Sequence, residues 1–108
     1  MVDLNYAHEK LAVTMDSLAV HPAALKVRLL SAVESSFVRL GEDLLPEDLR
    51  GLYRSIYRDI AQRPAAAGLT SGGFAACINS LTEEEALDVA RRIARLAAEV
   101  ASRQAERV

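Results

Sequence analysis

Residues 81–100 read LTEEEALDVARRIARLAAEV, and this stretch decides the fold class. Apolar residues recur in it every three or four positions, which is the spacing of one face of an α-helix. The members of this face are Ala86, Ala90, Ile93, Ala97 and Val100. Thr82 can cap the first turn, and Glu85, three residues later, can complete a capping box. We therefore predict a long helix over residues 83–105.

Followed outward toward the N-terminus, the same spacing predicts four more helical segments. They cover residues 72–80, 46–62, 22–40 and 3–20. Asp3, Pro22 and Pro46 suit helix starts, and Gly41 suits a helix end. No stretch alternates in the manner of a strand. We expect an all-α fold over residues 1–108: one domain, a compact bundle of four main helices plus the short helix at 72–80.

The composition of the chain indicates what its core is made of and argues against several classes of protein. Hydrophobic residues make up 51% of the chain but aromatic residues only 5%, so the core must consist mainly of Ala, Leu, Val and Ile. A net charge of −2 argues against a general nucleic-acid or membrane-surface binder. No segment approaches the roughly 20 apolar residues of a membrane span, and the first residues lack the pattern of a secretory signal. We expect a cytoplasmic protein, and the excess of arginine over lysine with many alanines indicates a bacterial source.

Three features resemble catalytic or ligand sites, and we interpret each as structural. The glycines of 68–73 lack the lysine that a phosphate-binding loop requires, so we interpret this stretch as a spacer. Cys77 lies on an apolar stripe with no ionisable residue between 64 and 82, which favours a core position. His8 lies within the apolar face of 3–20, without a second metal-ligand residue at helical spacing. We expect no enzyme activity, no metal and no cofactor; an enzyme or ligand carrier built on His8 or Cys77 remains the least favoured alternative.

The most distinctive surface feature is a ridge of arginines on segment 46–62. Arg50, Arg54 and Arg58 recur every four residues, and Tyr53 and Tyr57 flank them on the core side. Arginine contacts phosphates and tyrosine stacks on bases, so a nucleic-acid-associated regulator is one reading of this ridge. The other is a solvated arginine face, because acidic residues that can pair with the arginines lie nearby in sequence. These acids are Glu42, Asp43, Glu47, Asp48 and Asp59.

Several predicted helices carry more apolar residues than one buried face needs. The residues on the additional faces of the first two segments form a candidate oligomer face. They are Tyr6, Val13, Val20, Val27 and Val38. Surplus apolar surface favours association, so we expect a homodimer or a protein partner; the alternative is a central helix that buries both of its faces within the monomer. The sequence thus predicts a small non-enzymatic interaction or regulatory module, acting as a homo-oligomer or complex subunit.

Overall fold

The computed structural model describes residues 2–20, 24–61 and 73–106, and these contain helices and no strand. The all-α prediction is therefore confirmed. Three short 3-10 turns, η1, η2 and η3, connect α2 to α3. The elements are α1 (Leu4–Val20), α2 (Leu25–Ser35), η1 (Phe37–Arg39), η2 (Glu42–Leu44), η3 (Glu47–Leu49), α3 (Arg50–Ala61), α4 (Gly73–Asn79) and α5 (Glu83–Glu106). No helix in the described ranges is long and apolar enough to cross a membrane.

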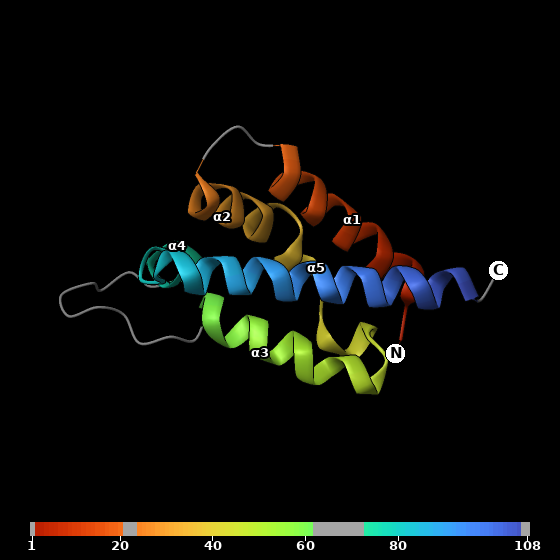
Figure 1. The fold of residues 1–108 in the computed structure, drawn as a ribbon. Coiled ribbons are helices and arrows are strands. Elements are labelled where there is room, and N and C mark those ends of the chain that lie inside the picture. Colours follow the sequence, from red (N-terminus) through yellow and green to blue (C-terminus); the bar gives the residue numbers. More distant parts are fainter. Residues whose placement is uncertain (1, 21–23, 62–72, 107–108) are drawn as a thin grey trace.

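The longest helix, α5, is the centre of the fold. It runs between α1 and α2 on one side and α3 on the other, and it contacts all three (Figure 1). Val89, Ile93, Leu96 and Val100 are completely buried along it. Most of the apolar residues of this helix are thus used inside the chain, as expected of a central helix, while Leu87 stays 41% exposed.

Local capping explains where α1 and α5 begin. The Tyr6 amide donates to Asp3 Oδ1 at 3.0 Å, so Asp3 caps α1 as predicted. At the start of α5 the Glu85 amide donates to Thr82 Oγ1 at 3.1 Å, and the Thr82 amide donates to Glu85 Oε1 at 2.9 Å. The predicted capping box is present.

The prediction of one helix over 22–40 was wrong, because α2 ends at Ser35. Ser36 leaves the helical region, with φ −142° and ψ −45°. Its hydroxyl donates to the Ala32 carbonyl at 3.1 Å and lies 2.7 Å from the Thr14 hydroxyl of α1. This polar contact holds the bend, and the following η1 turn places Phe37 completely inside the core.

The other predicted boundaries need smaller corrections. Pro46 has an extended ψ of 147°, so it precedes the helix instead of opening it, and the chain makes the η3 turn before α3 starts at Arg50. The short predicted helix is α4, and the last helix ends at Glu106, one residue beyond its predicted end. The predicted start at Pro22 and the spacer of 68–73 lie outside the described residues, apart from Gly73 itself, which begins α4.

Candidate interaction pocket on α3

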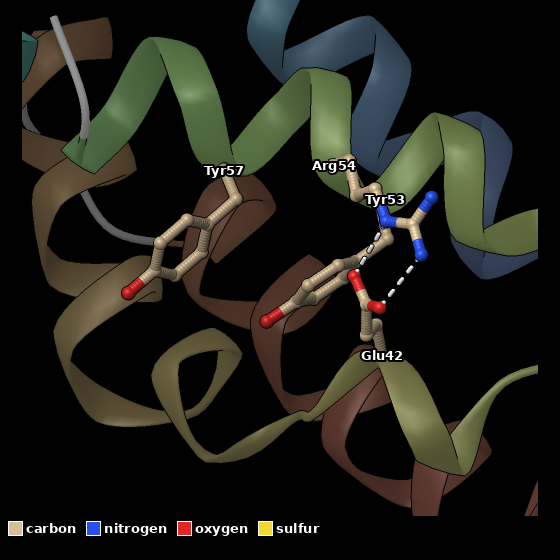
Figure 2. Close-up of a pocket in the computed structure, with 4 residues that line it drawn as sticks. All are labelled: Glu42, Tyr53, Arg54 and Tyr57. Carbon is tan, nitrogen blue, oxygen red and sulfur yellow. Dashed lines mark hydrogen bonds and ion pairs between the residues drawn. The ribbon is translucent and has the colours of Figure 1, made fainter.

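The outer face of α3 and the η2 turn enclose a pocket of about 270 Å³. It is lined by Glu42 of η2 and by Tyr53, Arg54 and Tyr57 of α3 (Figure 2). We call it the Tyr57 pocket. Three of the five residues predicted from the arginine ridge therefore line one hollow. The amphipathic pattern of α3 explains this placement, since its apolar face is buried while Arg54 remains exposed.

A row of aromatic rings forms the base of the pocket. Tyr53 stacks between Phe37 and Tyr57, with ring centroids 5.5 and 6.0 Å away, and Tyr57 meets Phe74 of α4 edge to face at 6.3 Å. Only 8% of Tyr53 is exposed, whereas Tyr57 is half-buried. Tyr57 is therefore the tyrosine of this pair whose ring a ligand can reach.

The Tyr53 hydroxyl has a structural role. It donates to the Leu40 carbonyl at 2.6 Å, which fixes the end of η1 against α3. Burial, with smaller contributions from the nearby Tyr57, Glu42 and Asp43, raises the pKa of Tyr53 to about 12. Tyr53 was predicted at the core side of the ridge, and the structure places it there.

One side of the pocket is a bidentate ion pair. Arg54 donates through Nε and Nη2 to the two carboxylate oxygens of Glu42, both at 2.8 Å. The hydrogen bond from Arg54 holds the pKa of Glu42 below its ordinary value, and the same bond raises the pKa of Arg54. Both side chains are well exposed, at 65% and 41%, so the pair adds little to stability. Its effect is to fix the position of the Glu42 carboxylate beside the tyrosine rings.

The other two arginines of the ridge make different contacts. Arg50 Nε donates to the carbonyl oxygens of Glu42 and Leu45, each 3.1 Å away, and so ties η2 to α3. Arg58 is 67% exposed and lies 3.9 Å from the Asp59 carboxylate. The three arginines predicted as one ridge therefore divide into a backbone tether, an ion-paired wall of the pocket and an exposed cation.

Two ion pairs that join α5 to the α3 region were not predicted. Arg92 donates to Asp59 at 2.5 Å and to the Ser55 carbonyl at 2.9 Å, and it also pairs at 2.8 Å with Asp88, four residues earlier on α5. Because only 19% of the Arg92 side chain is exposed, it belongs to the α3–α5 interface and not to a solvated network. The pair of Arg92 with Asp88 follows helical spacing, whereas the contacts of Arg92 with α3 depend on packing.

The second of these pairs lies at the far end of α5. Arg103 donates through Nη1 and Nη2 to the two oxygens of Asp48, both at 2.6 Å, and also lies 3.7 Å from Glu99. The hydrogen bond from Arg103 lowers the pKa of Asp48. The acidic stretch before α3 is thus paired with α5 as well as with the arginine ridge.

The remaining candidates from the sequence lie elsewhere. Cys77 of α4 is buried, whereas His8 of α1 is half-buried. In the described ranges no three His, Cys, Asp or Glu side chains are grouped so that they could hold a metal ion. Neither residue lines the Tyr57 pocket.

The candidate oligomer face is spread over α1, α2 and η1. Val13, Val27 and Val38 are 45%, 52% and 43% exposed. Tyr6 is half-buried, and its hydroxyl donates to the Arg39 carbonyl at 3.4 Å; the Val20 side chain lies outside the described part. Scattered exposed valines are common on monomeric proteins, so their exposure alone does not mark an interface.

No family model, no curated protein and no solved structure matches this chain. The residues of the Tyr57 pocket are therefore interpreted from their own geometry.

Proposed function

We propose that the chain is a small non-enzymatic interaction module that works as a homo-oligomer or as a subunit of a larger complex, with the Tyr57 pocket as its contact surface. The observation that supports this most directly is the composition of the pocket. Tyrosine and arginine are the residue types, with tryptophan, that contribute most to protein interfaces, and interface anchors fill pockets of this kind. Here Tyr57 offers a half-buried ring, and the exposed ion pair of Arg54 and Glu42 lies at the same hollow.

The charged groups of the pocket favour binding over catalysis. A general acid or base works best with a pKa near the operating pH. The contact with Arg54 moves the Glu42 pKa downward, away from neutrality, and burial moves the Tyr53 pKa upward to about 12. Both groups therefore keep one protonation state at neutral pH. The side chains of the pocket can orient a partner, but they are poorly suited to transfer protons.

The nucleic-acid alternative receives less support from the same contacts. Binding to phosphates requires cations that are free to pair with them. Arg50 is engaged with carbonyl oxygens and Arg54 with a carboxylate, while the ring of Tyr53 is buried. Arg58 has the loosest contact of the three arginines, and a single cation is a weak basis for nucleic-acid affinity.

The first test of the proposal is the solution mass, measured by light scattering during gel filtration over a dilution series. A mass of twice the chain indicates a homodimer, and Tyr57→Ala and Arg54→Ala are then expected to weaken dimerisation at least tenfold. Val27→Ser is the matched control, because Val27 is exposed on α2 and belongs to the other candidate face. Weakening by Val27→Ser alone would place the interface on the valines and overturn the proposal.

If the chain is a monomer, a photo-crosslinking amino acid at position 58 tests for a different partner in cells of the source organism. Position 58 is exposed next to the pocket, and position 27 serves as the control site. The proposal expects a discrete crosslinked product at position 58 that disappears with Tyr57→Ala. A monomer without such a product, or with equal products at both positions, would overturn it. The melting temperature of each variant verifies that it remains folded.

A further inference from the structure

We infer that the Tyr57 pocket binds the guanidinium of an arginine side chain presented by a partner protein. This inference rests on the proposed interaction function and names the chemical group that the pocket recognises. It follows from three properties of the pocket: the sign of its charge, the flat ring that it offers, and the acceptor capacity left on Glu42.

The charge around the tyrosine rings favours a cation. Glu42 lines the pocket, and Asp43 follows it on the same η2 turn. Both carboxylates lie close enough to Tyr53 to disfavour its ionised form, in addition to burial, which is the main cause of its raised pKa. The face of a tyrosine ring is itself negative and attracts cations within about 6 Å of its centroid. These contributions act in the same direction.

The shape of the pocket favours a planar cation. Figure 2 shows the rings of Tyr53 and Tyr57 side by side, with the carboxylate of Glu42 beside Tyr53, on the side away from Tyr57. A guanidinium is flat and can stack on an aromatic face while its edge donates to a carboxylate, whereas an ammonium is a compact and strongly hydrated charge. A ligand arginine stacked on Tyr57 would point its N–H groups toward the Glu42 side of the hollow.

Glu42 keeps acceptor capacity for such a ligand. A carboxylate has about four lone-pair sites, and Arg54 uses one on each oxygen. The bidentate pair as a whole carries no net charge, so a second cation meets no net repulsion from it. Arg54 therefore acts as a positioning residue that holds Glu42 in place for the incoming group.

An acidic ligand fits the pocket less well. To reach Arg54 it would have to displace Glu42 from a bidentate contact, and it would then lie close to Glu42, Asp43 and the negative faces of the rings. A neutral proline-rich segment could stack on Tyr57 but would leave the free acceptor sites of Glu42 unused. The arginine side chain is the ligand that uses both features.

The test is a titration of the ¹⁵N-labelled full chain with N-acetyl-arginine-N-methylamide, followed by amide chemical shifts. The matched control ligand is the citrulline derivative, which keeps the planar shape and N–H donors of the side chain but carries no charge. The lysine derivative keeps the positive charge but lacks the planar group. We expect saturable shifts at Glu42, Arg54 and Tyr57, with affinity at least tenfold weaker for citrulline and at least threefold weaker for lysine. Glu42→Gln and Tyr57→Leu should each weaken arginine binding at least fivefold, and Val27→Ser should leave it unchanged.

Absence of saturable shifts, equal binding of arginine and citrulline, or equal binding of arginine and lysine would overturn the inference. So would unchanged affinity in Glu42→Gln, whose own spectrum shows whether the exposed substitution leaves the fold intact. The proposed function fails separately, through the solution mass and the crosslinking at position 58. A partner that crosslinks there while the arginine derivative does not bind would preserve the proposed function and reject the arginine ligand.

Discussion

Replacing Tyr53 with phenylalanine removes one hydroxyl and keeps the ring that stacks between Phe37 and Tyr57. The lost group is the donor of the 2.6 Å hydrogen bond to the Leu40 carbonyl, in a side chain that is 8% exposed. A buried hydrogen bond contributes about 1 kcal/mol net, and a buried carbonyl left without a donor costs about 1–3 kcal/mol. We expect Tyr53→Phe to lower the free energy of unfolding at pH 7 by about 1–2 kcal/mol, with a fall in melting temperature of about 5 °C for each kcal/mol.

The same substitution should change how stability depends on alkaline pH. The pKa of Tyr53 rises from 10.0 to about 12 in the folded chain. Because the folded value is the higher one, the stabilisation is fully present below pH 10 and is lost as the pH rises toward 12. The wild-type protein should lose about 1.4 kcal/mol per pH unit in this window, whereas phenylalanine has no proton to release. The stability advantage of about 1–2 kcal/mol over Tyr53→Phe should therefore vanish between about pH 10.7 and about pH 11.5.

The assay is urea unfolding of both proteins between pH 7 and pH 11.5, followed by far-ultraviolet circular dichroism. Titration of the other groups is common to the two chains and cancels in their difference. Equal stability at pH 7 would show that the hydroxyl makes no net contribution. A difference that stays constant between pH 9 and pH 11.5 would refute the raised pKa, and with it the burial of the hydroxyl.

Five further substitutions test contacts elsewhere in the fold. Thr14→Val and Ser36→Ala should each lower the free energy of unfolding by about 1 kcal/mol, since each removes the 2.7 Å contact between the two buried hydroxyls while the remaining hydroxyl keeps a backbone carbonyl partner. The double variant should lose less than the sum, and additivity in urea unfolding would contradict the contact. Ile93→Ala, at a completely buried site, should lower the free energy of unfolding by about 2–5 kcal/mol in the same assay. Leu87→Ala, at a site that is 41% exposed, should lower it by less than about 1 kcal/mol. Equal losses would contradict the central position of α5. Asp48→Asn should flatten the dependence of melting temperature on pH between pH 5 and pH 2. The pKa of Asp48 is lowered in the folded chain, so its contribution to stability is present above its ordinary pKa of 3.8 and is lost as the pH falls below that value. An unchanged fall in melting temperature at acid pH would contradict the pairing of Asp48 with α5.

The helices that could be predicted closely are those whose ends are set by neighbours in sequence. Asp3 caps α1, and the capping box of Thr82 and Glu85 begins α5, so spacing alone located both starts. The end of α2 could not be found in this way. The apolar period continues through Phe37, but the chain bends at Ser36 because its hydroxyl meets Thr14 of another helix. That contact joins residues 22 positions apart and has no local signature.

For the candidate site, sequence identified the residue types but not their contacts. Tyr53, Arg54 and Tyr57 share a pocket because they follow helical spacing on α3. The different contacts of the arginines depend on how η2 folds back along α3, which brings Glu42 within reach of a residue 12 positions later. The pairs of α5 with Asp59 and Asp48 span 33 and 55 positions and likewise required the packed fold.

The central position of α5 also changes which surface matters for association. Surplus apolar residues favoured a homodimer. On α5 the apolar residues Val89, Ile93 and Leu96 are buried inside the chain, whereas Val13, Val27 and Val38 of the candidate oligomer face stay 45%, 52% and 43% exposed. The Tyr57 pocket differs from the scattered exposed valines because contacts within the chain hold its walls in position. Arg50 fixes η2 through two carbonyl oxygens, and the Tyr53 hydroxyl fixes the end of η1. A carboxylate and a ring that are already in position need little ordering when a partner arrives, and lower ordering cost leaves more of the contact energy for binding. The tethers that make Arg50 and Tyr53 poor ligand contacts are therefore the reason that Glu42 and Tyr57 can be good ones.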